Sequence, residues 1–230
     1  MGKRGQASGS DCSRALSPFS SKFKKLPLLG ILRGIKPGEL EPLTATIIES
    51  GLQTIEITMN TSGASGLLKK TVQLAGKKLM IGAGTVLTLD ELKLAIDSGA
   101  TFIVMPVLVE NVVKYCVKKK TPVFPGAFTP FEIYKAWQAG ATMVKVFPAQ
   151  SAGGPDYFKE VKGPFNHIEL LACGGITPDN LSSYFENGAS AIAFGGSVFR
   201  KDWLREKNFK KSGEAIKELI DAYRNIAAKK

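Results

Sequence analysis

Two titratable residues stand inside apolar runs that are typical of buried strands. Lys145 lies within "MVKVFP" and Glu56 within "TIEIT", and most of their neighbours are β-branched. Lysine and glutamate are almost never fully buried without a partner. Alternate residues of a strand point to opposite faces, so both charges point away from the valines and isoleucines beside them. Such residues need a compensating environment, which makes them candidates for chemistry.

The chemistry available to this pair is carbon–carbon bond cleavage. Removal from water favours the neutral amine of a lysine, which attacks a carbonyl to form a Schiff base. The protonated Schiff base is an electron sink for breaking an adjacent carbon–carbon bond, and a nearby carboxylate can move the protons that this requires. Lys145 and Glu56 therefore suffice for a metal-free aldolase. The alternative is a buried structural ion pair.

A repeated unit predicts the elements that position these residues. Each copy is the end of a helix, a glycine that tolerates left-handed backbone geometry, and a short apolar strand. The glycines are Gly51, Gly99, Gly140 and Gly188. Four further strands are expected near Leu28, Met80, Val123 and Ile168, which makes eight. Helical spacing of apolar residues predicts helices over Glu39–Ser50, Leu89–Ser98, Val109–Lys119, Thr129–Ala139 and Pro178–Asn187.

Eight alternating strands and helices in 230 residues predict an α/β fold, a single-domain (β/α)8 TIM barrel, rather than an open doubly wound sheet. In a barrel, Lys145 and Glu56 both point into the interior near the C-terminal ends of their strands. Barrel enzymes place their active sites at that end.

The net charge of +11 comes from the two ends of the chain. Residues 1–25 hold six Lys or Arg against one Asp, and residues 200–230 hold ten against five acids. We therefore expect a flexible basic tail over residues 1–25, and a barrel over residues 26–230 that ends in a basic helical segment. The Ser-rich tail suits a disordered segment, a remnant of cloning or a transit peptide. Nucleic-acid binding through the tails is a weaker alternative.

Neither a metal nor a cofactor is expected. Cys12, Cys116 and Cys173 lie far apart without a CxxC spacing, and His167, the one histidine, lies in a polar segment that suits the surface. No apolar run approaches a membrane span, and the first 25 residues lack the apolar region of a signal peptide. A cytoplasmic protein without a membrane partner is therefore expected.

Two glycine clusters follow the seventh and eighth strands, where barrels commonly bind phosphate through backbone N–H groups. They are Gly174-Gly175 and Gly195-Gly196-Ser197. In "GAGTV", Thr85 could bind a carboxylate, although a cap or turn role is equally open.

An ordered set of motifs runs from Leu26 to Phe199: "ILRGI", "IEITMNT", "IGAGTVL", "PGAFTPFE", "KVFPA", "GGITPDN" and "GGS". In these motifs the chain resembles the 2-keto-3-deoxy-6-phosphogluconate (KDPG/KHG) aldolase family, which are class I pyruvate aldolases. The resemblance implies Lys145 as the Schiff-base residue, Glu56 as the general acid/base, and Thr85, Pro125 and Gly126 around the pyruvyl carboxylate. It also implies phosphate binding by Gly174, Gly175, Gly195, Gly196 and Ser197, and a homotrimer that acts in the Entner–Doudoroff pathway.

Three positions depart from the gluconate-type members of that family. Asn60 stands where many of them have Arg, and Arg33 could supply the missing charge, a pattern closer to the 6-phosphogalactonate aldolases. Cys173 stands where they have Thr, and Met105 where a small hydroxyl residue is common. Arg33, Asn60 and Cys173 are therefore substrate-binding candidates, and the substrate stereochemistry stays open.

The leading hypothesis is reversible cleavage of 2-keto-3-deoxy-6-phosphogluconate to pyruvate and glyceraldehyde 3-phosphate. The galactonate isomer and 4-hydroxy-2-oxoglutarate are alternative substrates. A phosphosugar isomerase or synthase on a similar barrel would keep the phosphate site but need no imine. A non-catalytic nucleic-acid binder is the alternative outside enzymes.

Overall fold

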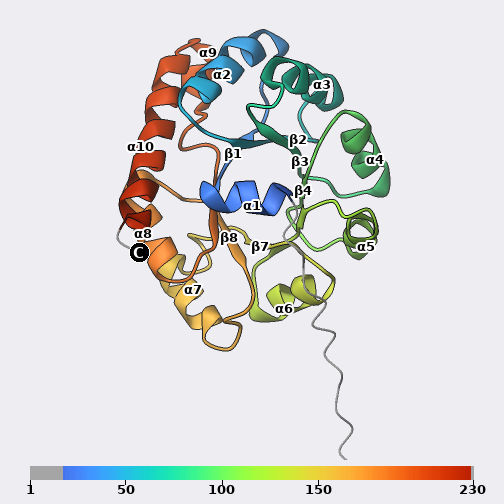
Figure 1. The fold of residues 1–230 in the computed structure, drawn as a ribbon, viewed down its shortest axis with the longest axis vertical. Coiled ribbons are helices and arrows are strands. Elements are labelled where there is room, and N and C mark those ends of the chain that lie inside the picture. Colours follow the sequence, from blue (N-terminus) through green and yellow to red (C-terminus); the bar gives the residue numbers. More distant parts are fainter. Residues whose placement is uncertain (1–17, 229–230) are drawn as a thin grey trace, which may run out of the picture.

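Parallel strands form the centre of the computed structural model, which describes residues 18–228, and helices surround them (Figure 1). Nine strand segments hydrogen-bond in the order β5-β4-β3-β2-β1-β9-β8-β7-β6. They are β1 Leu28–Leu32, β2 Thr54–Thr58, β3 Met80–Gly84, β4 Ile103–Val104, β5 Val123–Phe124, β6 Gly126–Ala127, β7 Val144–Val146, β8 Leu170–Cys173 and β9 Ala191–Phe194.

The segments β5 and β6 together form one strand of the barrel. Pro125 separates them, and proline cannot donate a hydrogen bond to a neighbouring strand. Because β5 pairs with β4 and β6 pairs with β7, this strand joins the two ends of the sheet. The predicted eight-stranded barrel is thereby confirmed.

Ten helices occur within residues 18–228. They are α1 Pro18–Lys25, α2 Pro37–Glu49, α3 Ala64–Ala75, α4 Leu89–Asp97, α5 Glu110–Lys118, α6 Pro130–Gln138, α7 Gly154–Lys162, α8 Pro178–Glu186, α9 Lys201–Arg205 and α10 Phe209–Ala227. The five predicted helices correspond to α2, α4, α5, α6 and α8. Helix α6 has a strong start signal, because the Thr129 hydroxyl accepts a hydrogen bond from the Glu132 backbone N–H. Helices α3 and α7 follow Gly63 and Gly153 instead, so their starts carry no such signal.

Helix α1 differs from the flexible tail expected over residues 1–25. It lies across the centre of the barrel in Figure 1, and Phe23 is fully buried there. The Phe23 ring lies 6.1 Å from that of Phe124, and the Phe19 ring lies 4.9 Å from that of Phe102. Residues 18–25 therefore close the N-terminal end of the barrel. The expected tail over residues 1–17, with Cys12, lies outside the described residues.

The barrel has two hydrophobic layers, as the strand alternation predicts. Ile55, Ile57, Val144 and Val146 belong to the cluster between strands and helices. Met143 belongs to a smaller cluster inside the barrel. Glu56 and Lys145 alternate with the outward residues and so point inward.

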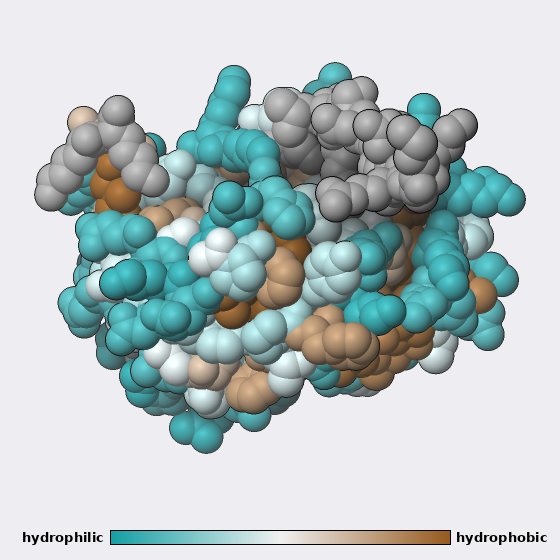
Figure 2. Space-filling view, turned by 90° about the horizontal axis from the view of Figure 1, so that it is seen from below, coloured by the Kyte–Doolittle hydropathy of each residue, from teal (hydrophilic) through white to brown (hydrophobic). Residues whose placement is uncertain are grey.

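The outer surface is largely hydrophilic, with smaller groups of exposed hydrophobic residues, on the face shown in Figure 2. In the part of the chain from Pro18 to Ala228, no helix is both long and apolar enough to cross a membrane.

Candidate active site

Lys145 lies in the middle of β7, between Gly126 of β6 and Leu171 of β8. Its backbone N–H donates a hydrogen bond of 2.9 Å to the Pro125 carbonyl, and only 4% of the residue is exposed. The Nζ atom lies 5.0 Å from the centroid of the Phe147 ring. The backbone of Pro125 and Gly126 therefore runs directly beside the lysine.

Gly126 is required by close packing rather than by backbone conformation. A Cβ atom at this position would overlap the Pro106 carbonyl. The segment after β4 can therefore approach β6 this closely only because residue 126 has no side chain.

Glu56 lies in the middle of β2, and only 1% of it is exposed. Its Oε2 atom has no hydrogen-bond partner among the described residues. Burial raises the pKa of this carboxyl, while the positive charges of Lys145 and Arg33 act in the opposite direction. No ion pair joins Glu56 to Lys145 within residues 18–228, although their charges interact. The carboxyl thus lies near enough to the amine for their charges to interact, and within these residues no hydrogen bond holds its Oε2 atom.

Gly84 at the end of β3 makes room for that carboxyl. A Cβ atom on Gly84 would overlap the Glu56 carboxylate. Thr85 follows with a positive φ of 56°, and its hydroxyl accepts a hydrogen bond of 3.4 Å from Arg33 Nη2. Thr85, Arg33 and Glu56 therefore form one side of the site. The sequence analysis did not assign Gly84, and a glycine inside a strand pattern was its only signal.

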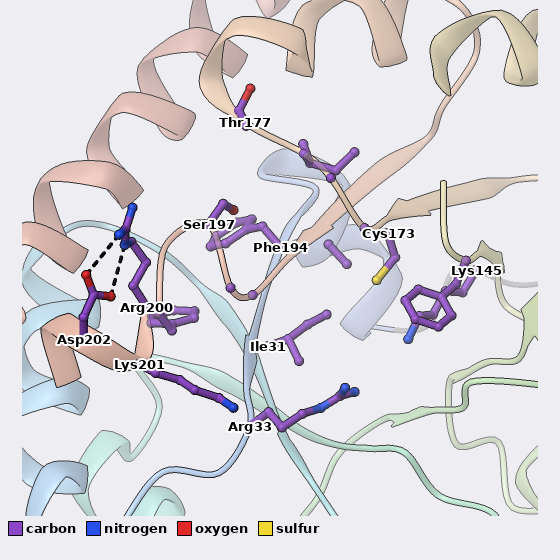
Figure 3. Close-up of a pocket in the computed structure, with 18 residues that line it drawn as sticks. Ile31, Arg33, Lys145, Cys173, Thr177, Phe194, Ser197, Arg200, Lys201 and Asp202 are labelled. Carbon is purple, nitrogen blue, oxygen red and sulfur yellow. Dashed lines mark hydrogen bonds and ion pairs between the residues drawn. The ribbon is translucent and has the colours of Figure 1, made fainter. Parts of the chain in front are cut away.

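A cavity of about 800 Å³ opens at the C-terminal ends of the strands (Figure 3). Lys145 and Cys173 lie at its inner end, and the turns after β8 and β9 form its wall. Predicted site residues that line it are Arg33, Lys145, Cys173, Gly174, Gly175, Gly195, Gly196 and Ser197. Glu56, Thr85, Pro125 and Gly126 lie behind this lining or beside it. Asn60 is exposed and does not line the cavity.

Comparison with known proteins identifies the family of the chain. Residues 19–215 match the family model described as KDPG and KHG aldolase. The chain belongs to that family. It is an aldolase, a carbon–carbon lyase.

Individual relatives of this aldolase match over nearly their full length. The chain is 33% identical over 199 residues to the 2-dehydro-3-deoxy-6-phosphogalactonate aldolase of Escherichia coli K12, covering 86% of this chain and 97% of the relative. It is 31% identical over 201 residues to the 2-dehydro-3-deoxy-phosphogluconate aldolase of Haemophilus influenzae, covering 87% and 94%. A solved structure described as native KDPGal is 32% identical with a TM-score of 0.82, covering 89% of this chain and 97% of that chain.

Cys173 of the aldolase lies beside the amine of Lys145. Burial raises the pKa of the Cys173 thiol, while the positive charge of Lys145 opposes that change. The thiol therefore stays protonated at neutral pH and offers only a weak hydrogen-bond donor to a ligand in the cavity.

Two basic residues of the aldolase cavity have no assignment from the sequence. Arg200 and Lys201 line the cavity and follow the turn at Gly195–Ser197 by three and four residues. Their only sequence signal is a pair of basic residues after that turn, within a C-terminal region that is basic throughout.

Among residues 18–228, no group of three or more His, Cys, Asp and Glu side chains could hold a metal ion. His167 packs edge-on against Trp137, with 6.2 Å between ring centroids, and does not line the cavity.

Proposed function

We propose that the protein is a class I aldolase that cleaves a 2-keto-3-deoxy-6-phospho sugar acid reversibly to pyruvate and glyceraldehyde 3-phosphate. The observation that carries the proposal is the burial of one lysine and one glutamate in the same barrel interior. Lys145 reaches the inner end of the cavity, and Glu56 Oε2 lacks a hydrogen-bond partner within the described residues. An amine and a carboxyl so placed can exchange protons with a bound keto acid.

In the proposed reaction, Lys145 Nζ attacks the C2 carbonyl carbon and forms a carbinolamine. Glu56 donates the proton with which the C2 hydroxyl leaves as water, and this gives the protonated imine. The Glu56 carboxylate left by that step accepts the C4 hydroxyl proton as the C3–C4 bond breaks. This releases the aldehyde, moves the bonding electron pair into a C2–C3 enamine and leaves Glu56 protonated for the next step. The enamine takes a proton at C3, and water then hydrolyses the imine to release pyruvate and the free lysine.

The glycine turns support a phosphorylated substrate. Backbone N–H groups at Gly174-Gly175 and Gly195-Gly196-Ser197 border the cavity and can approach phosphate oxygens closely. We assign the pyruvyl carboxylate to the side formed by Thr85 and Arg33. The carboxylate is on C1, next to the carbon that bonds Lys145, so it must lie near the inner end.

Two C4 epimers are candidates for the preferred substrate. The family resemblance made the gluconate compound the leading hypothesis, whereas the position of Arg33 at the cavity and of Asn60 outside it favours the galactonate compound. Relatives with either name are about equally similar. We favour the galactonate epimer, because Arg33 at the cavity and Asn60 outside it match the residue pattern of the 6-phosphogalactonate aldolases better than that of the gluconate-type members. The ratio of kcat/KM for the two epimers tests this choice, and a preference for the gluconate epimer would refute it.

We also propose that the aldolase acts as a homotrimer in the cytoplasm. Support for assembly comes from exposed apolar side chains after β4, after β6 and in the first turn of α6, among them Val107, Phe128 and Phe131. Light scattering after gel filtration measures the mass, and a monomer at micromolar concentration would contradict the trimer.

The experiment that tests the central step combines pyruvate with sodium borohydride and maps the labelled peptide by mass spectrometry. We expect a reduced pyruvyl adduct on Lys145, and none in Lys145→Met. The exposed Lys135 provides a matched control, and Lys135→Met should label like the wild type. Absence of an adduct in folded protein would refute the Schiff base and favour an isomerase or synthase.

A further inference from the structure

The cavity lining holds three basic side chains besides Lys145: Arg33, Arg200 and Lys201. The charge of Arg200 is already compensated. Its guanidinium donates hydrogen bonds of 3.1 and 3.0 Å to the Asp202 carboxylate and lies 5.0 Å from the Trp203 ring. In contrast, no hydrogen bond or ion pair involves the Lys201 side chain within residues 18–228. Lys201 is therefore the basic residue of this loop that is available to a ligand.

Lys201 lies on the part of the cavity lining that the outer end of a bound substrate would face. It follows the Gly195–Ser197 turn by four residues, and Figure 3 shows its side chain extending over the mouth toward Arg33. Arg33 is already engaged with the Thr85 hydroxyl on the Glu56 side. The space beside the turn is open, since a Cβ atom on Gly196 would meet no atom within 4 Å.

The covalent chemistry determines which anionic group of the substrate faces Lys201. The C1 carboxylate adjoins C2, which bonds Lys145 at the inner end of the cavity. The C6 phosphate lies at the other end of the carbon chain and must point to the mouth. A lysine ammonium on its flexible stem can follow such a group and donate to its oxygens.

We propose that Lys201 binds the phosphate of the substrate and so determines the preference for phosphorylated over unphosphorylated keto acids. This inference rests on the proposed aldolase function. Lys201 supplies a positive charge, which the backbone N–H groups of the glycine turns lack.

The test compares Lys201→Met with the control Lys217→Met. Lys217 is an exposed residue of α10 that does not line the cavity, so the control removes the same charge away from the site. Each variant is assayed for cleavage of the 6-phospho substrate and of the same keto acid without phosphate. We expect kcat/KM of Lys201→Met to fall about tenfold to a hundredfold for the phosphorylated substrate alone. Lys201→Arg should retain most of the preference, and Lys217→Met all of it.

Two results would overturn the assignment of Lys201. An equal fall for both substrates would mean that Lys201 only attracts anions in general, and an unchanged ratio would mean that it does not contact the phosphate. Trapping of pyruvate on Lys145 separates this failure from failure of the proposed function. If wild-type protein is labelled but the ratio is unchanged, the role of Lys201 alone is wrong. If wild-type protein is not labelled, the aldolase mechanism itself is wrong.

Discussion

Replacement of Glu56 by Gln removes the proposed proton donor while keeping the shape of the side chain. The site has little room for adjustment, because Glu56 is 1% exposed and Gly84 packs against its carboxyl group. We expect the amide to occupy the same place without transferring protons. General acid–base catalysis typically contributes about 100-fold to 10,000-fold in rate. A loss of this size in kcat corresponds to a rise of roughly 3–5 kcal/mol in the activation free energy.

The same substitution has a pH-dependent effect on stability. Burial raises the pKa of Glu56 in the folded protein above its ordinary value of 4.5, so the folded state binds more protons than the unfolded state. The stability contributed by this group is complete below the unfolded pKa and is lost as the pH rises through the folded pKa. Glutamine does not titrate. The free energy of unfolding of Glu56→Gln should therefore improve relative to wild type as the pH rises from about 4 toward neutrality.

The rate of pyruvate release from the 6-phospho substrate measures the loss in kcat of Glu56→Gln. Urea unfolding at a series of pH values measures its free energy of unfolding relative to wild type. The exposed Glu41 offers a matched control, since Glu41→Gln removes the same charge on the surface. A Glu56→Gln enzyme within tenfold of the wild-type kcat would refute the role of the carboxyl. A relative stability that falls with rising pH would refute the assigned effect of burial.

Two further predictions concern helix α1. Phe23→Ala should lower the free energy of unfolding by about 3–5 kcal/mol, because it empties a fully buried ring position against Phe124. A loss below about 1 kcal/mol in urea unfolding would mean that α1 does not pack on the barrel in solution. Lys24→Met should change stability by less than about 1 kcal/mol, since its 2.6 Å ion pair with Glu169 is partly exposed to solvent. A larger loss in the same assay would contradict that expectation.

The barrel and the inward orientation of its two charged residues could be predicted from local patterns. Alternation in "TIEIT" and "MVKVFP" assigns Glu56 and Lys145 to the face opposite the flanking isoleucines and valines. Glycines at helix ends mark the repeating strand-helix units. Each of these patterns spans only a few residues, so it can be recognised in the sequence without knowledge of the fold. The same holds for the glycine turns after β8 and β9.

The packing of α1 and the extent of the cavity required the tertiary structure. Phe19 and Phe23 stand in a polar, basic segment, and their partners Phe102 and Phe124 come from strands about 80 to 100 residues later in the chain. Burial of these rings depends on the barrel being assembled, so the local composition indicated a flexible tail instead.

The surroundings of each charged residue were likewise decided by neighbours that are distant in sequence. The room for Glu56 depends on Gly84, the pairing of Lys24 depends on Glu169, and Asn60 lies outside the cavity that Arg33 lines. A residue type indicates what chemistry a side chain can perform. Its exposure, partners and access to a ligand depend on how closely the folded elements approach one another, because contact and electrostatic energies vary with distance and burial.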